Sequence, residues 1–221
     1  MQTDITLFVG PTLFGTGIRP ETYPNITFKP PVRRGDIAQL AQDESPGIIG
    51  IVDGTFHAFP SVSHVELREA MEQGWRIFGL CSMGAIRAAE MQHMGLRPWG
   101  KVADIFCSNP DFADDEVTLV HSVDAPFVPL SEPLIHIREF LSQMYLQQEI
   151  AESEYRNVLD FMHQQWYGTR TLRVLQDRLL ATLRLDKLTP VLADALSNFQ
   201  SYRIKQTDLL QFVHSKPWLA A

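Results

Sequence analysis

Residues 76–89 read RIFGLCSMGAIRAA, and this run contains the clearest structural signal in the sequence. Its first residues are largely apolar and end at Gly79, a second glycine follows at Gly84, and an alanine-rich segment continues beyond it. A short buried strand that passes through a tight turn into a helix is the unit from which parallel α/β sheets are built. The run therefore predicts a strand at Arg76–Phe78 and a helix at Met83–His93.

The same pattern recurs through the first half of the chain. Short β-branched runs that end at glycine, proline or a polar residue predict further strands. These strands are expected at Ile5–Val9, Ile26–Phe28, Ile48–Val52 and Val117–Val120. Helical patterns lie between them at Asp36–Gln42 and Ser63–Gln73, and the second begins with the capping box of Ser63 and Glu66. We expect an α/β fold with a doubly wound, mostly parallel sheet of four to five strands.

The hydrophobic period changes to about 3.6 residues near Ser131, which is typical of amphipathic helices. The first stripe comprises Leu134, Ile137, Phe140, Leu141 and Met144. Four or five helices are expected, with breaks near Gly168 and Pro190. The sequence thus predicts an α/β core at residues 1–130 and an all-helical lobe at residues 131–221 that packs on it.

Charge and composition restrict the possible functions. The 221 residues carry 26 acidic and 19 basic side chains, so binding to a nucleic-acid backbone is not expected. No uncharged run is long and apolar enough to span a bilayer, and the first positive charge is Arg19, so we expect a cytoplasmic protein that does not bind membranes. Cys81 and Cys107 form neither a disulfide framework nor a CxxC pair, and we expect no metal and no cofactor.

Polar residues follow several of the predicted strands. In an open α/β sheet, ligands bind beyond the carboxyl ends of the strands, where helix N-termini present free amides. This rule selects Gly10-Pro11-Thr12, Asp53–His57, Gly79–Gly84 and His121. We expect these segments to line one edge of the sheet.

Ser82 is the first candidate nucleophile, because it stands between a predicted strand and a predicted helix. The arrangement resembles a nucleophile elbow, in which the amides near Met83 and Gly84 would form an oxyanion hole, although the glycine two residues before the serine is missing. A plain helix N-cap explains Ser82 equally well. Cys81 is the second candidate, in a position more typical of a small buried hydrophobe.

A serine hydroxyl needs a base to remove its proton, and two histidines are candidates. His57 could take the proton from Ser82, and Asp53, which precedes Gly54, could orient that base or hold a backbone turn. The alternative is an Asx turn with a histidine that is satisfied elsewhere. His121 is the other candidate base, and the acidic residues before it could bind a divalent ion or, as we prefer, form a solvated turn.

Two charged pairs could contact a substrate. Arg33 and Arg34 follow a proline pair and could bind a carboxylate or phosphate, with a solvated loop as the alternative. Arg87 and Glu90 are one helical turn apart and could equally form an ion pair with each other. The candidate substrate-binding residues are Gly10, Pro11, Thr12, Arg33, Arg34, Gly54, Met83, Gly84, Arg87 and Glu90.

Six segments, in order, resemble the TfuA-like core domain family. They are VGPT (Val9–Thr12), PVRRGD (Pro31–Asp36), VDGTFH (Val52–His57), CSMGAIRAAE (Cys81–Glu90), DEV (Asp115–Val117) and PLSE (Pro129–Glu132). The block that begins at Ser82 is the most specific of them. The resemblance covers roughly residues 5–145 and leaves the helical tail uncovered.

The resemblance implies a partner of a YcaO-type enzyme in peptide backbone thioamidation. In that scheme the TfuA-like protein hydrolyses the C-terminal thiocarboxylate of a ThiS-type sulfur carrier and releases sulfide for the YcaO enzyme to install. The precursor peptide is a further candidate partner. In this interpretation Ser82 attacks the thioacid carbonyl, the amides near Met83 and Gly84 hold the oxyanion, and water then clears the acyl-enzyme.

Two other functions stay open. A non-enzymatic adaptor could deliver the peptide or the sulfur carrier to the YcaO enzyme through the helical tail, and it would not need Ser82. A hydrolase of another acyl or amide substrate would use the same elbow, because neither the fold nor the elbow identifies the acyl group.

Overall fold

A computed structural model describes residues 5–56 and 59–220, and the chain forms two compact units. The first unit contains the residues up to Phe112, Asp124–Phe127 and the residues from Lys205 onward. The second contains Ala113–Val123 and Val128–Ile204. These limits differ from the boundary expected at residue 130, chiefly because the C-terminal helix packs into the core of the first unit.

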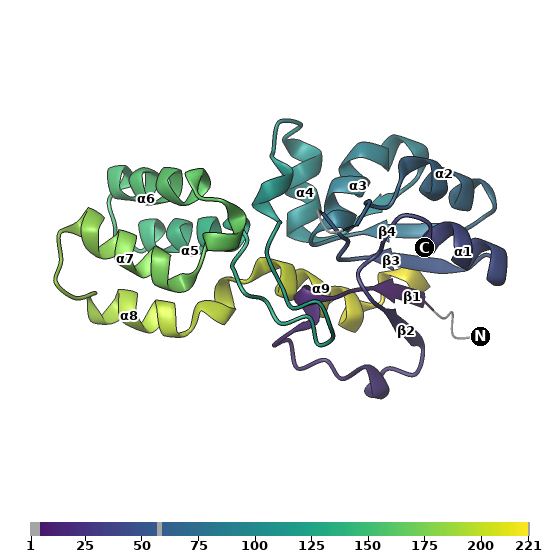
Figure 1. Ribbon diagram of the computed structural model, residues 1–221, viewed down its shortest axis with the longest axis horizontal. Helices are drawn as coiled ribbons and strands as arrows, with labels where there is room; N and C mark the ends of the chain where they lie inside the picture. The colour runs from purple at the N-terminus through teal and green to yellow at the C-terminus, as the bar shows by residue number, and fades with distance from the viewer. Residues whose placement is uncertain (1–4, 57–58, 221) are drawn as a thin grey trace. The chain divides into compact units, whose positions relative to one another are not determined.

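The first unit is built on a five-stranded sheet in which every pairing is parallel. Its strands are β1 (Ile5–Phe8), β2 (Ile26–Lys29), β3 (Ile48–Ile51), β4 (Arg76–Gly79) and β5 (Arg97–Pro98). Their order across the sheet is β2-β1-β3-β4-β5 (Figure 1). The parallel α/β fold expected from the sequence is confirmed.

The strand expected at Val117–Val120 is wrong. Thr118 forms turn hydrogen bonds and is not paired in the sheet. Its amide donates to Asp115 O and its hydroxyl to Asp114 O, which continues the 3₁₀ turn Asp114–Glu116. The Val120 amide donates to Ser131 Oγ. The backbone polar groups of this segment are therefore hydrogen-bonded through turns and side chains. The fifth strand is β5 instead, a two-residue strand that ends in a proline at the edge of the sheet, where a missing amide is tolerated.

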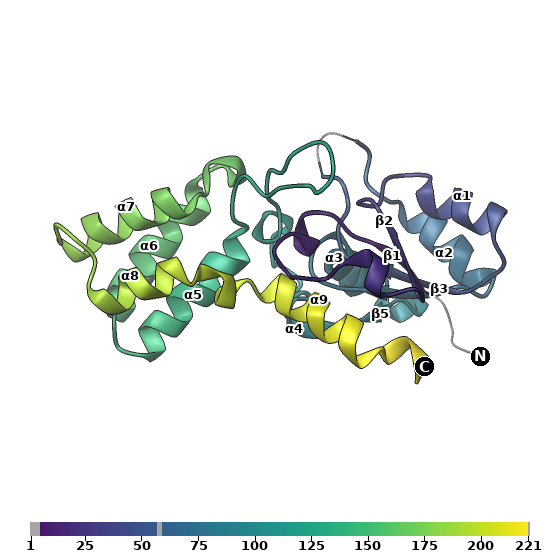
Figure 2. The same ribbon diagram turned by 90° about the horizontal axis from the view of Figure 1, so that it is seen from below.

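Helices cover both faces of the sheet because successive strand residues point to opposite sides. Ile49 and Ile51 pack with the helices α1 (Asp36–Asp43), α2 (His64–Glu72) and α3 (Met83–Met91). Ile48 packs with Leu209 and Phe212 of α9 (Ile204–Ser215) on the other face. Figures 1 and 2 show the two layers, with α9 nearest the viewer in Figure 2. A further helix, α4, spans Gly100–Ser108.

The expected capping box at the start of α2 is present. The Ser63 hydroxyl accepts from the Glu66 amide at 3.2 Å, and Glu66 Oε1 accepts from the Ser63 amide at 2.6 Å. The second oxygen of Glu66 accepts from the Gly35 amide at 2.9 Å, at the start of α1. One buried carboxylate therefore fixes the beginnings of two helices, which explains its low exposure.

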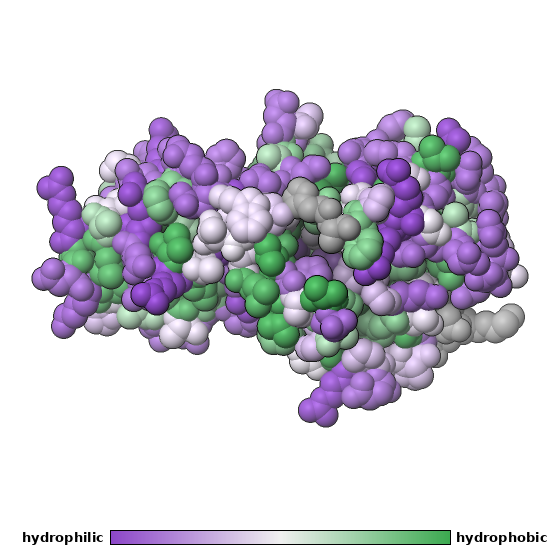
Figure 3. Space-filling view, viewed as in Figure 1, coloured by the Kyte–Doolittle hydropathy of each residue, from purple (hydrophilic) through white to green (hydrophobic). Residues whose placement is uncertain are grey.

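The second unit is helical, as expected for this part of the chain. Its helices are α5 (Leu134–Leu146), α6 (Glu152–Gln164), α7 (Leu172–Leu183) and α8 (Pro190–Ser197). Gly168 lies in the 3₁₀ turn between α6 and α7, and Pro190 is the first residue of α8, so both expected breaks are found. Apolar groups appear among mainly hydrophilic side chains on the surface of these helices (Figure 3).

Arg170 holds the second unit together from its interior, where it is 1% exposed. Its guanidinium donates to the Asp115 carbonyl and carboxylate at 3.0 and 2.6 Å, and to the carbonyls of Met162, His163 and Gln165. These bonds fasten the turn at Asp114–Glu116 to the end of α6.

Among the described residues, no helix has both the length and the apolar character needed to cross a membrane.

Candidate functional site

Three loops that follow neighbouring strands meet at the carboxyl edge of the sheet. β1 leads into Gly10 and the 3₁₀ turn Pro11–Leu13, β3 leads into Asp53, and β4 leads into Ser82. Backbone bonds join the loops, since the Asp53 amide donates to Phe8 O at 3.2 Å and the Ser82 amide to Val52 O at 3.2 Å. The edge selected from the sequence therefore exists, and these residues line it.

Asp53 anchors the first of these loops. It is 2% exposed, and its Oδ2 accepts from the amides of Gly10 and Thr12, both at 2.9 Å. Its Oδ1 accepts from the Thr12 hydroxyl at 2.7 Å. Of the two roles expected for Asp53, the geometry accounts for the one that holds a backbone turn.

Ser82 is the N-cap residue of α3, and it is 3% exposed. Its side chain makes no capping hydrogen bond to the amides of its own helix. The plain N-cap interpretation, which requires such a bond, therefore does not account for a serine here. The turn is tight because a Cβ on Gly84 would lie 1.7 Å from Ile51 O, and one on Gly79 would lie 2.1 Å from Gly84 O.

The backbone amides after Ser82 differ in what they contact. The Gly84 amide donates to Val52 O over a long 3.4 Å, so it is not the free oxyanion donor that the sequence suggested. The Met83 amide donates to no acceptor within the described part of the chain, and it stands at the N-terminus of α3. A helix N-terminus carries partial positive charge, so the Met83 amide is the one placed to hold an oxyanion.

Cys81 bears the backbone strain of the turn, with a φ of 64°. It is fully buried, and its Sγ donates to Lys205 O at 3.1 Å. Burial raises the pKa of this thiol well above its ordinary value, and the nearby carboxylates of Asp208 and Asp53 raise it further. The thiol is therefore held in its protonated form, which is a poor nucleophile.

Polar residues of α9, which the sequence did not single out, complete this edge. Lys205 is 1% exposed, and its Nζ lies 4.0 Å from Asp53 Oδ1. Gln206 donates to Phe14 O at 2.8 Å. Asp208 accepts from the amides of Lys101 and Val102 at 3.0 and 2.9 Å, at the start of α4. Burial raises the pKa of Asp208 to about 6.

Sequence reasoning missed Lys205 because α9 has no clear amphipathic stripe. Lys205, Gln206 and Asp208 are buried polar residues interspersed with buried apolar ones, whereas an ordinary surface helix separates the two kinds. That lack of separation is the signal that a sequence reader could have used.

Of the two candidate histidines, His121 alone belongs to the residues that the structure describes. His57 lies outside the described residues. His121 belongs to the second unit, where its Nδ1 lies 2.7 Å from Ser122 O and its backbone forms an isolated bridge with Pro129. Because Val117–Val120 is not a strand, the argument that placed His121 at the sheet edge fails. Both histidines stay candidates from the sequence only.

The other candidate residues have structural partners of their own. Arg87 donates to Glu90 Oε2 at 2.6 Å and to Val62 O at 3.1 Å, so the expected i, i+3 ion pair is present. Gly54 passes close to Met83, because a Cβ there would lie 2.6 Å from the Met83 Cγ. These contacts hold α3 against its neighbours beside the turn.

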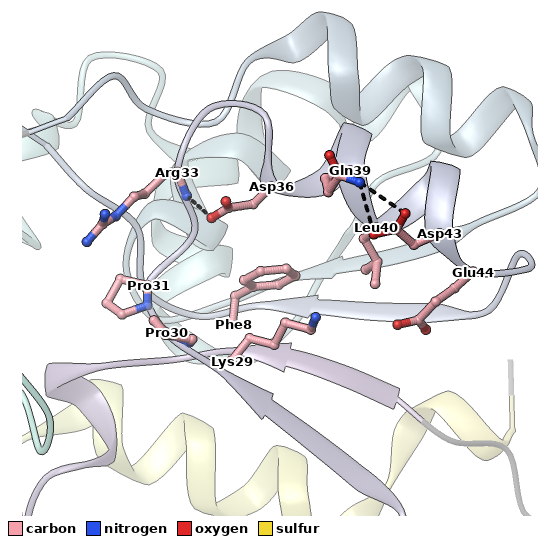
Figure 4. Close-up of a pocket in the computed structure, with 10 residues that line it drawn as sticks. All are labelled: Phe8, Lys29, Pro30, Pro31, Arg33, Asp36, Gln39, Leu40, Asp43 and Glu44. Atoms are coloured by element: carbon pink, nitrogen blue, oxygen red, sulfur yellow. Dashed lines mark hydrogen bonds between the residues drawn. The ribbon is translucent and has the colours of Figure 1, made fainter.

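Arg33 and Arg34 lie at the surface, and Arg33 lines a hollow of about 340 Å³ between β2 and α1 (Figure 4). The Arg33 guanidinium packs on the Phe59 ring at 3.9 Å, and Figure 4 shows its side chain directed away from the other labelled residues. Arg34 Nε donates to Ser61 O at 3.3 Å. Acidic side chains, including Glu44, share the hollow with Lys29, so it carries no uniform charge to select an anion.

Over residues 5–56 and 59–220, no three His, Cys, Asp or Glu side chains come together as a group that could hold a metal ion.

The comparisons with known proteins add one finding. No curated protein matches the chain. A family model described as TfuA-like protein matches residues 53–171, from Asp53 at the sheet edge to the start of α7, which is more than half of the chain. The chain therefore belongs to the TfuA-like protein family.

Proposed function

We propose that this protein is a hydrolase that supplies sulfide to a YcaO-type enzyme, with Ser82 as the nucleophile. The TfuA-like family is associated with YcaO-type peptide thioamidation, so the role of this chain is associated with that modification. The proposed substrate is the C-terminal thiocarboxylate of a ThiS-type sulfur carrier.

The observation that carries the proposal is the pairing of Ser82 with the Met83 amide. Ser82 caps α3 without a capping bond from its side chain, and the next amide has no acceptor among the described residues. When a hydroxyl attacks a thioacid carbonyl, negative charge develops on the carbonyl oxygen, and an amide at a helix N-terminus stabilises it. The nucleophile and the donor then lie on adjacent residues, as an acyl-transfer site requires.

Cys81 is the weaker candidate nucleophile for two physical reasons. Its thiol points into the apolar core formed with α9, where it donates to a backbone carbonyl. Its pKa is raised by burial, so little thiolate forms near neutral pH. A substitution at Cys81 should therefore alter packing more than chemistry.

The test measures sulfide released from a thiocarboxylated sulfur carrier by the full chain. We expect Ser82→Ala to lower the rate by about a thousandfold or more, because a nucleophile is lost. Cys81→Ala is the matched neighbouring variant, and it should keep a substantial part of the activity. Carrier binding, measured by calorimetry, should persist in both variants.

Other results would change the assignment. Full activity in Ser82→Ala with loss in Cys81→Ala would make the thiol the nucleophile. Wild-type protein that binds the carrier and releases no sulfide would favour the non-enzymatic adaptor. Turnover of simple esters or amides in place of the thiocarboxylate would favour a hydrolase of another acyl group.

A further inference from the structure

Arg33 and Arg34 are two exposed arginines that the proposed reaction does not use. They follow Val32 in the loop between β2 and α1. Within the described residues, neither guanidinium forms an ion pair with a carboxylate. Acids are nevertheless abundant in this part of the chain, since residues 1–130 carry 16 acidic and 9 basic side chains. Internal ion pairing therefore does not explain this adjacent basic pair.

The neighbouring acids and arginines of the first unit are used differently. Arg87, for example, donates to Glu90 at 2.6 Å. The carboxylate of Asp36 instead accepts from the backbone amide of Arg33 at 2.8 Å, at the start of α1. Figure 4 shows the Arg33 side chain directed away from Asp36 and from the other labelled residues. The acid closest to Arg33 in sequence thus holds the backbone and leaves the guanidinium to the surface.

Both guanidinium groups are held by contacts that leave donors open. Arg33 Cζ lies 3.9 Å from the centroid of the Phe59 ring, a contact that uses no N–H group in a hydrogen bond. Arg34 Nε donates to Ser61 O at 3.3 Å. An arginine has five N–H donors, so most of the donors of the pair remain for a ligand. Because the side chains are already placed, a ligand loses less of its binding free energy to ordering them.

The pair adjoins the edge of the sheet that carries Ser82. Val32, which precedes Arg33, forms a parallel bridge with Gly54. Gly54 in turn packs closely on the residue after Ser82, because a Cβ there would lie 2.6 Å from the Met83 Cγ. The two arginines therefore leave the chain within two residues of a bridge that contacts the proposed site.

We propose that Arg33 and Arg34 form a docking surface for acidic side chains on the folded body of the sulfur carrier. The inference rests on the proposed function, and it names the chemistry of the carrier surface. A protein that presents a thiocarboxylate to this edge has to lie against the residues around it. The reacting group is not the anion assigned to the arginines, because it must reach Ser82, which is 3% exposed, whereas both arginines are exposed.

Charge complementarity of this kind acts mainly on encounter and orientation. The chain as a whole carries a formal net charge of −7 at pH 7, so it repels an acidic partner at a distance. An exposed basic pair attracts that partner at one place and thereby fixes how it approaches. Arginine stays protonated at any physiological pH, so the attraction should depend on salt and not on pH near neutrality.

The test measures binding of the full-length protein to the carrier in its ordinary carboxylate form, which requires no hydrolysis. We expect Arg33→Gln and Arg34→Gln each to raise the Kd by about threefold at low salt, and the double variant to raise it by about tenfold. The matched control Arg19→Gln removes one positive charge from an exposed position in the same unit. It should bind the carrier like the wild type.

A readout that a purely structural role would not move is the salt dependence of binding. The wild-type Kd should rise as salt increases to about 0.5 M, where charges on two surfaces are screened within a few ångströms. The Kd of the double variant should rise less, because fewer charges attract the carrier. Equal binding by the wild type and the double variant at low salt would overturn the proposal, as would wild-type binding that salt does not weaken.

A synthetic peptide separates the carrier body from the reacting group. The peptide has the C-terminal sequence of the carrier and its thiocarboxylate, but it lacks the folded body. The kcat/KM of the full carrier should exceed that of the peptide, and this advantage should shrink by about tenfold in the double variant. A double variant that slows both substrates equally would place the thiocarboxylate itself on the arginines and would overturn the docking surface.

Binding and turnover together separate the two proposals. Arginine-dependent carrier binding without sulfide release would keep the docking surface and remove the hydrolase. Sulfide release from the full carrier with the wild-type kcat/KM in the double variant, at low salt, would keep the hydrolase and remove the docking surface.

Discussion

The two compact units bury basic side chains in different ways. In the second unit, Arg170 is 1% exposed and donates to Asp115 at 2.6 Å and to several backbone carbonyls. In the first unit, Lys205 is equally buried, but it lies 4.0 Å from an Asp53 oxygen that also accepts a 2.7 Å bond from Thr12. The guanidinium donates to several backbone carbonyls, whereas the Asp53 carboxylate beside the amine also holds the loop at Thr12.

The two arrangements fix the chain in different ways. A guanidinium that fills its donor positions with backbone carbonyls fixes the chain around it. At the edge of the sheet a carboxylate does this, because Asp53 accepts from the loop at Gly10 and Thr12. The comparison therefore predicts stability losses in both units, with the larger loss in the second.

The largest stability loss is expected for Arg170→Met. The substitution leaves several carbonyls and the Asp115 carboxylate, which is 40% exposed, without their donor, and each buried polar group left unsatisfied costs about 1–3 kcal/mol. The control Arg173→Met removes an arginine whose side chain is 91% exposed, and it should change stability little. Denaturant unfolding measures both. A loss below about 1 kcal/mol in Arg170→Met would contradict the anchoring role.

The next effect is a pH dependence that arises at Asp208. Its pKa is raised from 3.8 to about 6 by burial, while the amides of Val102 and Lys101 act in the opposite direction. The folded-state pKa lies above the unfolded value, so the native state binds more protons between about pH 4 and 6. Stability should therefore fall as the pH rises through this window, by up to about 3 kcal/mol.

Asp208→Asn should remove most of that pH dependence, because the amide oxygen still accepts a bond and carries no charge. Asp160→Asn, at an exposed position on α6, is the matched control and should leave the pH dependence unchanged. Unfolding free energies of the three proteins from pH 4 to 7 give the comparison. A wild-type curve that runs parallel to that of Asp208→Asn would show that Asp208 does not titrate in this window.

A smaller effect is expected where the backbone approaches Asp208. Gly100 has a φ of +87°, and a Cβ there would lie 2.5 Å from the Asp208 carboxyl carbon. Gly100→Ala should cost about 2 kcal/mol, because the left-handed strain is joined by displacement of that carboxylate. Gly95 also has a positive φ, but no atom would lie within 4 Å of its Cβ, so Gly95→Ala isolates the strain at about 1 kcal/mol. Equal losses would exclude the close contact as a cause.

The sheet and its helices could be predicted because their signals are local. The strands near Ile5, Ile48 and Arg76 end at glycine or at a polar residue, and the capping box at Ser63 marks the start of α2. Val117–Val120 has the composition of a strand, but a preceding 3₁₀ turn and the Ser131 hydroxyl satisfy its backbone. Tertiary bonds of this kind leave no periodic pattern in the sequence.

The candidate site could be predicted only in part for the same reason. Asp53, Thr12 and Ser82 each follow a strand, and the rule for parallel sheets brings them to one edge. Lys205 reaches that edge from a helix more than 120 residues further along the chain, and no local pattern connects it to Ser82. Its contact with the turn depends on how α9 packs under the sheet.

Stability effects of similar size are expected at two buried threonines, one in each unit, which compare the two environments directly. Thr12 donates to the Asp53 carboxylate at 2.7 Å, and Thr118 donates to the Asp114 carbonyl at 2.9 Å. Both are 3% exposed, and valine has nearly the shape of threonine. A bond to a charged acceptor contributes more than one to a neutral carbonyl, so we expect losses of about 2 kcal/mol for Thr12→Val and about 1 kcal/mol for Thr118→Val.

Denaturant unfolding measures both variants. Equal losses in Thr12→Val and Thr118→Val would mean that the Asp53 carboxylate holds the Thr12 loop no more strongly than the Asp114 carbonyl holds the turn at Thr118.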